Sequence, residues 1–467
     1  MEAENARSRR MNVVLGIGAG LAGGSIRSLC LHASLSPGLL TGGAFGLFFA
    51  LFLIRRATSP GAGLIWGAST AFLLWIVQEA GESLFKLSAQ PSPLMLQDIR
   101  QRFPELVGNL VCLGLPVGVL LGLRGAGQNE SAGPPFRWGR AIVAGGFAGV
   151  ASGLIFGYWM LVGDFFPLLA GLGNFRSQTM AVAAQFAVAL AIGATFGLLF
   201  QRDVRGYGSC MGWGVGYAML WWFAEPLFFF PLVRHVPLDW SAEHASDLFG
   251  PLVGHVLYGL ILGISYATFD RIWVRLFIQS DPLNRKPEGP GLRILRSLQW
   301  GLAAGFTGGV ISSPVMIATG MLPGTHHRVV EGLFLHLLVS SLIGMNFGLL
   351  FRDEASNIGV GIGWGWLFGL MWWYAGPMTL LPLLSTGVID WRPSAALSLL
   401  PSVAGHLIYG AVTAFIFLAI ERQFSRQRKS AAGIRKAETD GPNPFSPTPA
   451  LWMFVLGLGI LLPVLLG

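Results

Sequence analysis

The chain has 467 residues, of which 53% are hydrophobic and only 12% are charged, and its mean hydropathy is +0.60. This composition, which includes 65 glycines, excludes the class of soluble globular proteins and indicates a chain that is solvated by a lipid bilayer. The formal charge of +8 lies in short loops, so we assign it to anionic lipid headgroups and expect no nucleic-acid partner.

Charged residues are absent from long stretches, which leaves apolar runs of about 18 to 25 residues, the length that a helix needs to cross a bilayer. The runs cover residues 11–34, 38–54, 61–85, 104–123, 138–162, 179–200, 207–231, 247–269, 295–320, 331–351, 357–384, 396–420 and 449–466. We therefore predict an all-α integral membrane protein with about 13 transmembrane helices.

The distribution of basic residues predicts the orientation. The first run follows Arg7, Arg9 and Arg10 and continues for a full span without a clear cleavage site, so we interpret it as a helix that starts in the cytoplasm. Alternating the loops from there places 23 of the 31 Lys and Arg residues inside and 7 outside, with Arg27 within the first span. This asymmetry follows the positive-inside rule.

An internal repeat predicts the architecture. The groups Gly212-Trp213-Gly214 and Gly254-His255 recur 151 residues later as Gly363-Trp364-Gly365 and Gly405-His406, with many matches between them. A divergent first copy has Asn109 at the histidine position. Each copy holds four spans, an even number, so the copies are predicted to be parallel four-helix repeats. We divide the chain into repeats at 1–124 (divergent), 137–276 and 293–422, a basic cytoplasmic linker at 423–448 and a C-terminal transmembrane helix at 449–467.

Glycines recur every four residues in the first helix of each repeat. Small residues at this spacing lie on one helix face and allow close helix packing in lipid. The glycines are Gly16, Gly20, Gly24, Gly145, Gly149, Gly153, Gly157, Gly301, Gly305 and Gly309.

Few ionisable or amide groups lie within the spans, and such groups are candidates for function. We predict a polar pathway in the outer half of the bilayer, where equivalent positions of the three repeats converge. Its candidate residues are Asn109, His255, His406, Glu79 and Glu225. The alternative is structural: each histidine donates to a backbone carbonyl or a tyrosine, and each glutamate reaches the headgroups. The pairs Trp221-Trp222 and Trp372-Trp373 are interpreted as interfacial anchors.

No pattern for a metal, a cofactor or an enzyme is present. Cys30, Cys112 and Cys210 are isolated on apolar helices, and His336 has no counterpart in the second repeat. A transition-metal site would need a third ligand at helical spacing. We predict no metal and no cofactor; the missing motifs disfavour an enzyme, although a membrane enzyme stays open as an alternative.

The segment Asp247-Leu248-Phe249-Gly250, followed by Gly254-His255 and Tyr258-Gly259, resembles the terminal helix of YagU-like bacterial inner-membrane proteins, which also begins with phenylalanine, glycine and histidine. The likeness covers one repeat at a time, and this chain differs in having three repeats and a thirteenth helix. The resemblance implies a location in the bacterial inner membrane and no particular activity.

Three functions remain open from the sequence. The first is a transporter or channel for a small solute or ion, with a path between the repeats. The second is a structural or scaffold subunit that binds other membrane subunits. The third is an electron-transfer protein in which His255 and His406 hold a b-type haem.

Overall fold

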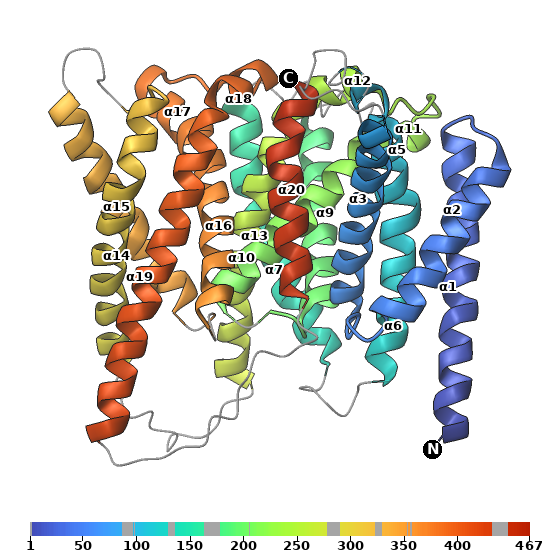
Figure 1. Ribbon diagram of the computed structural model, residues 1–467, viewed down its shortest axis with the longest axis horizontal. Coiled ribbons are helices and arrows are strands. Elements are labelled where there is room, and N and C mark those ends of the chain that lie inside the picture. The colour runs from blue at the N-terminus through green and yellow to red at the C-terminus, as the bar shows by residue number, and fades with distance from the viewer. Residues whose placement is uncertain are drawn as a thin grey trace. The chain divides into compact units, whose positions relative to one another are not determined.

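The computed structural model describes residues 2–85, 97, 99–128, 136–162, 178–204, 206–277, 290–322, 329–352, 354, 357–431 and 447–467. These residues form helices and no strand, and 13 of the helical segments among them are long and apolar enough to span a membrane. Each of the thirteen overlaps one predicted run, from Arg9–Cys30 to Thr448–Leu466. The protein is therefore an all-α, multi-pass membrane protein (Figure 1).

The chain forms two compact units. The first comprises Met1–Val204, Trp213–Tyr266 and Phe445–Gly467, and the second comprises Arg205–Gly212 and Ala267–Pro444. Two long helices, α10 (Tyr207–Ala224) and α13 (Phe249–Phe277), have residues in both units. The unit boundary thus falls inside the predicted second repeat, 137–276, and not at its ends.

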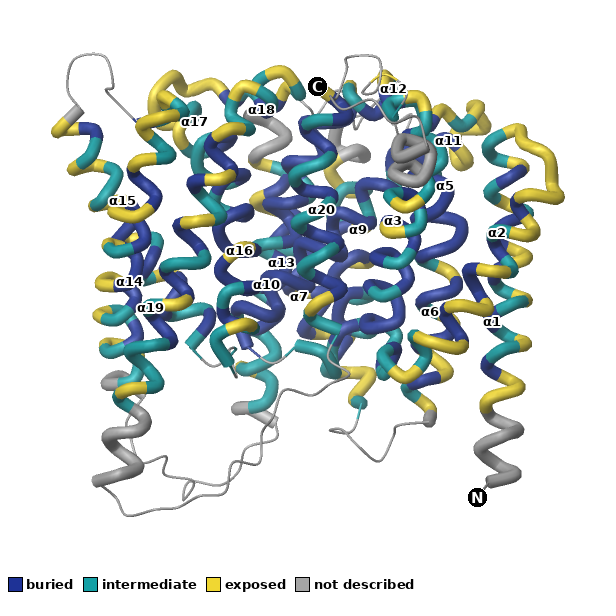
Figure 2. The backbone as a smooth tube through the Cα atoms, viewed as in Figure 1, coloured by how far each residue is buried: buried dark blue, intermediate teal, exposed yellow. Residues whose placement is uncertain are grey.

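The first unit contains most of the shorter segments. Besides its parts of α10 and α13, its elements are α1 (Glu2–Cys30), α2 (Leu35–Phe48), η1 (Phe49–Leu53), α3 (Pro60–Phe85), α5 (Phe103–Gly108), η2 (Asn109–Gly114), α6 (Leu115–Gln128), α7 (Trp138–Val162), α9 (Gln178–Phe200), η4 (Glu225–Phe229), α11 (Phe230–Val233), α12 (Ala242–Asp247) and α20 (Thr448–Leu466). Exposed residues run along α1 and α2, whereas α10, α13 and α20 are largely buried (Figure 2).

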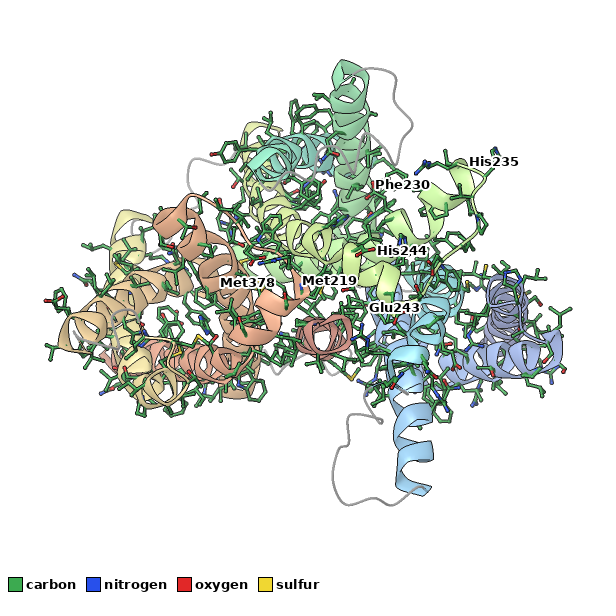
Figure 3. All side chains as sticks on the ribbon, turned by 90° about the horizontal axis from the view of Figure 1, so that it is seen from above. Met219, Phe230, His235, Glu243, His244 and Met378 are labelled. Atoms are coloured by element: carbon green, nitrogen blue, oxygen red, sulfur yellow. The ribbon has the colours of Figure 1, made fainter. Side chains whose placement is uncertain are left out.

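The second unit is built from the remaining helices. They are α14 (Pro290–Ala318), α15 (Val329–Phe351), α16 (Ile358–Ala375), η5 (Gly376–Leu380), α17 (Leu381–Thr386), α18 (Pro393–Leu399) and α19 (Pro401–Ala431). Viewed end-on, the long helices of each unit stand roughly parallel to one another (Figure 3). Here α14 packs on α15 and α19, and α16 packs on α19.

The glycine ladders lie where helix backbones touch. A Cβ atom at Gly20 would collide with the Gly42 carbonyl of α2, one at Gly149 with the Ala189 carbonyl of α9, and one at Gly305 with the Ser340 carbonyl of α15. Gly16, Gly24, Gly145 and Gly301 likewise face a backbone carbonyl, and Gly153 and Gly309 face the Cβ of a small residue. Gly157 is the exception, because no described atom lies within 4 Å of its Cβ position. At the nine ladder positions other than Gly157, the neighbouring helix is so close that only a glycine, which has a hydrogen in place of a side chain, fits.

Among the described residues, four π-helical segments, η1, η2, η4 and η5, lie within the spans. Two of them share a cause: Pro226 and Pro377 occupy the second position of η4 and η5. Proline lacks the amide hydrogen and its ring clashes with the carbonyl four residues before it, so the turn widens. The predicted seventh and eleventh spans are therefore helices with a π-helical turn in their interior.

Several hydrogen bonds occur twice, the second time between residues that lie 151 positions later in the chain. Trp222 Nε1 donates to the Leu248 carbonyl, and Trp373 Nε1 donates to the Leu399 carbonyl. Tyr258 Oη donates to the Ala189 carbonyl at 3.1 Å, and Tyr409 Oη donates to the Ser340 carbonyl at 2.6 Å. Residues that match in sequence therefore make matching contacts within their own units.

Each unit contains a helix contact at which a serine hydroxyl donates to a carboxylate and a phenylalanine packs on a glycine. We call each of these two contacts a seam. In the first unit, Ser59 donates to Asp203 at 2.5 Å and Phe200 packs on Gly61. In the second unit, Ser209 donates to Glu354 at 3.1 Å and Phe351 packs on Gly208. In both cases the start of a third helix of one predicted repeat meets the end of the second helix of the next.

Two turns between the spans carry a repeated Asp-Trp pair. Asp239 accepts from the Ser241 amide at 2.9 Å, and Asp390 accepts from the Arg392 amide at 3.2 Å and from its guanidinium. The following tryptophans bond inward: Trp240 Nε1 donates to the Leu227 carbonyl and Trp391 Nε1 donates to Thr379 Oγ1. The backbone bond from Ser241 lowers the pKa of Asp239, and the Arg392 guanidinium lowers that of Asp390.

Because the pKa values of both aspartates are lowered, we expect the folded protein to lose a little stability in acid. Because the folded-state pKa of each aspartate is depressed, its stabilisation is complete above the unfolded value of about 3.9 and is lost as the pH falls through the folded pKa. We expect the melting temperature of Asp239→Asn to be slightly below that of the wild type at pH 7 and to approach it as the pH falls below about 3.9. Thermal unfolding in detergent across this range measures the effect, and a gap that widens towards low pH would contradict it.

Candidate functional site

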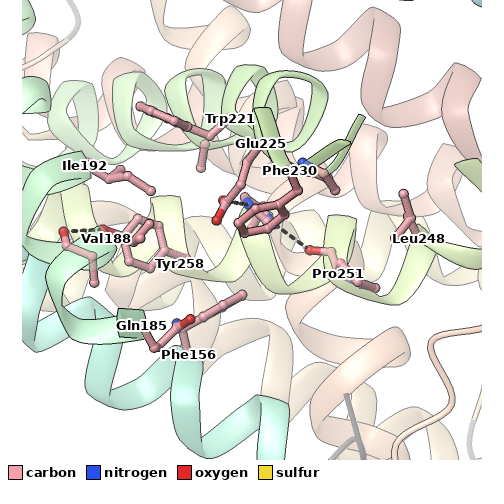
Figure 4. A pocket seen from close by; sticks show the side chains of 14 residues that line it. Phe156, Gln185, Val188, Ile192, Trp221, Glu225, Phe230, Leu248, Pro251 and Tyr258 are labelled. Carbon is pink, nitrogen blue, oxygen red and sulfur yellow. Dashed lines mark hydrogen bonds and ion pairs between the residues drawn. The ribbon is translucent and has the colours of Figure 1, made fainter. Parts of the chain in front are cut away.

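A pocket of about 40 Å³ lies in the first unit, lined by residues of α7, α9, α10, η4, α11 and α13 (Figure 4). One water molecule needs a space of roughly 10–15 Å³, so the pocket can hold a small ion or a few waters. Its walls are Phe156, Gln185, Val188, Ala189, Ile192, Ala218, Trp221, Glu225, Pro226, Phe230, Leu248, Pro251, His255 and Tyr258. Most of these side chains are apolar, so the few polar groups must orient whatever binds.

Two of the predicted pathway residues meet in this pocket. Glu225, the first residue of η4, places Oε2 at 3.4 Å from Nε2 of His255 on α13. Both side chains are largely buried, with exposed fractions of 14% and 12%. His255 comes six residues after Phe249, the start of α13, which is about 9 Å along the helix. The structure thus holds a carboxyl group and an imidazole together within the apolar span.

The second nitrogen of His255 fixes the protonation chemistry of this pair. Nδ1 lies 2.8 Å from the Pro251 carbonyl oxygen, which can only accept, so Nδ1 carries a hydrogen. Nε2 then faces the carboxyl group with room for a single shared proton, held either as imidazolium with carboxylate or as imidazole with carboxylic acid. With that proton the pair is neutral, and without it the pair has one negative charge.

The opposite wall supplies an amide and an aromatic ring. Gln185 on α9 points into the pocket, and its amide has no hydrogen-bond partner among the described residues (Figure 4). The Phe156 ring meets the His255 ring edge-on, with centroids 5.6 Å apart. The same ring lies 2.7 Å from where a Cβ atom of Gly254 would stand, so a glycine there allows α7 to approach α13.

His406 belongs to the second unit, where it repeats part of this arrangement. Its Nδ1 donates to the Ser402 carbonyl at 2.9 Å, as His255 does to Pro251. The residue 151 positions after Glu225 is Gly376, so no carboxyl group accompanies this histidine at that position. The structural interpretation of the histidines, a bond to a backbone carbonyl, holds for both.

Asn109 begins η2 in the first unit and is fully buried. Neither its amide nitrogen nor its amide oxygen has a hydrogen-bond partner among the residues that the structure describes. It does not line the pocket of Glu225 and His255. Glu79 lies on α3, but its side chain is outside the described residues. The convergence of Asn109, His255 and His406 around one axis therefore stays a prediction.

The sequence did not single out two further groups. Gln185 is an isolated amide in an apolar run, and only its position 151 residues before His336 marks it. Arg27, in the last turn of α1, lies 3.6 Å from Glu105 of α5, an ion pair that joins the first and fourth spans. The sequence does indicate Arg27, because it is the one Lys or Arg residue that lies inside a predicted span.

The tandem tryptophans differ from the expectation. Trp222 and Trp373 are fully buried and bond to backbone carbonyls in their own units, so they are core residues and not interfacial anchors. Trp221 lines the pocket. Adjacent residues on a helix point about 100° apart, and in the first of these pairs this directs one ring to the core and the other to the site.

Comparisons of the chain with protein-family models, with curated proteins and with solved structures find no match. Conclusions on function therefore depend on the geometry of the site in a multi-pass membrane protein.

Proposed function

We propose that the protein is a transporter that exchanges protons for a small inorganic cation at the pair Glu225 and His255. The observation that carries this proposal is the 3.4 Å contact between the two side chains, with Nδ1 of His255 already committed to Pro251. That commitment leaves one exchangeable proton for the pair.

The exchange balances in charge. The protonated pair is neutral and stable in an apolar wall, whereas loss of the proton leaves one negative charge, which is costly unless a cation replaces it. Binding of a monovalent cation restores neutrality. Proton and cation therefore compete for the same place, which is the requirement for coupled exchange.

The pocket has suitable ligands for a hard cation. Such cations prefer carboxylate and amide oxygens, which Glu225 and Gln185 supply from facing walls. The volume of about 40 Å³ is large enough for an ion with a few waters. Glu225 also lies on the π-helical turn η4, and such turns inside α-helices are frequent at functional sites.

The proposal also includes the orientation of the chain, its membrane and the arrangement of its repeats. The bias of basic loops supports a cytoplasmic N-terminus, and the resemblance to YagU-like proteins supports the bacterial inner membrane. The matched contacts at 151 residues support parallel repeats. In contrast to a path between repeats, the proposed binding site lies within residues 156–258, inside the second one.

Proteoliposomes with an acidic interior and an enclosed pH dye test this function. We expect external Na⁺ or K⁺ to release protons from the interior at a rate that rises with the amount of protein. The bulky cation N-methylglucamine should have no effect, because it exceeds the pocket.

The other functions predict different results. Absence of proton release with both cations, in vesicles that contain correctly folded protein, would reject exchange and favour a scaffold that copurifies with other membrane subunits. A Soret band that disappears in His255→Ala would instead support the haem protein, although Nε2 of His255 here faces Glu225.

A further inference from the structure

The second unit contains a pair of histidines that the function proposed above does not use. His336 on α15 is 151 residues after Gln185, and His406 on α19 is 151 residues after His255. In the first unit, Gln185 and His255 line one pocket. The bonds from Tyr258 to Ala189 and from Tyr409 to Ser340 show that α15 and α19 pack as α9 and α13 do. By this register, His336 and His406 occupy the places of two residues that line one pocket in the first unit.

Backbone carbonyls fix the tautomer of each ring. His336 Nε2 lies 3.2 Å from the Gly309 oxygen, and His406 Nδ1 lies 2.9 Å from the Ser402 oxygen. Because a carbonyl only accepts, these two nitrogens carry the hydrogens. The lone pairs are therefore on His336 Nδ1 and His406 Nε2, and neither atom has a hydrogen-bond partner among the described residues.

This is the arrangement of metal-binding histidines. Such a residue almost always donates its other ring hydrogen to a carbonyl or carboxylate, which orients the ring and raises its basicity. The counterpart of Glu225 is Gly376, so no carboxylate at that position pairs with an imidazolium or attracts a hard cation. Two neutral imidazoles favour a softer metal.

Met316 contacts the residue that precedes His406. The sulfur of Met316 on α14 lies 2.6 Å from where a Cβ atom of Gly405 would stand, immediately before His406. A thioether selects Cu(I) among the metals that imidazole binds. Zinc would want at least three protein ligands, and no group of three His, Cys, Asp or Glu side chains suited to a metal occurs among the described residues.

We propose that His336 and His406 form a binding site for Cu(I), with Met316 as a further ligand. The site is separate from the pair Glu225 and His255, and it does not depend on the proposed proton exchange.

Titration of the full-length protein with Cu(I) tests this site. The protein is purified in detergent with an affinity tag free of histidine and is titrated under reducing conditions against a chromogenic Cu(I) chelator. We expect one tightly bound equivalent, and we expect it to be lost in His336→Gln and in His406→Gln. Glutamine is the natural residue at the counterpart of His336, which makes it a mild replacement. Met316→Leu should weaken binding without abolishing it.

Two controls keep the result interpretable. His244→Gln in α12 removes a histidine from an outer helix of the first unit and should bind Cu(I) as the wild type does. The melting temperature of the wild type should rise with Cu(I), because a ligand that binds only the folded state stabilises it. Binding that survives the double replacement of His336 and His406, or no Cu(I) binding by the intact wild type, would overturn the proposal.

Discussion

Glutamine at position 225 is expected to reduce cation-dependent proton release to the level of empty vesicles. The change keeps the size of the side chain and one oxygen, but it removes the negative charge that makes proton and cation compete. The neutral amide cannot give up a proton to the pocket, so the exchange cycle has no charge change to drive it. Initial rates of dye response in proteoliposomes, with Na⁺ and with K⁺, measure the loss.

Two further variants define what that loss means. Glu243→Gln removes an acidic side chain from α12, where it is exposed and does not line the pocket, and should exchange as the wild type does. His255→Gln retains the carboxyl group and should still bind cations, with a changed dependence on pH. Wild-type rates in Glu225→Gln would remove the pair from the mechanism even if transport itself were real.

Alanine at Gly20 is expected to destabilise the first unit by about 1–3 kcal/mol, the typical cost of overpacking. Its Cβ would collide with the Gly42 carbonyl and lie 2.8 Å from the carbonyl carbon, so α1 and α2 would have to separate. Leucine should cost more. The measurement is unfolding in detergent, followed by melting temperature and by the fraction of protein that remains monodisperse.

The matched control is two residues away on the same helix. Gly18 is exposed, and no described atom lies within 4 Å of its Cβ position. Alanine there should be neutral or slightly stabilising, because glycine in a helix is less favourable than alanine by roughly 0.5–1 kcal/mol. Equal losses at Gly18 and Gly20 would show that close backbone contact is not what these glycines provide.

The spans could be predicted from the sequence because length and apolarity alone decide whether a helix crosses a bilayer. The π-helical turns within them were missed, although Pro226 and Pro377 are visible, because an apolar run shows no discontinuity where a helix widens to π geometry. The short helices α12 and α18 were missed as separate elements because each is far below the length of a span, and the end of α18 falls inside the predicted run 396–420.

The site could be predicted only in part. Glu225 and His255 stand out because charge is rare in this chain, and they do lie together. Their neighbours Gln185 and Phe156 have no distinguishing pattern, since helix pairing selects which wall residues face each other. The counterpart of His336 is Gln185, and because the two residues differ in type, matching identical residues does not pair them. The register of 151 residues, applied by position, would have paired them.

The seams formed by Ser59 with Asp203 and by Ser209 with Glu354 have a consequence for how such a chain can be rebuilt. Each seam joins unlike surfaces, a serine-glycine edge on one side and a phenylalanine-acid edge on the other, so the building blocks can be added in only one order. Edges of the same kind are alike in the two seams, so the serine and glycine of the first seam complement the acid and phenylalanine of the second. A shortened chain without the middle block would therefore retain a complementary junction.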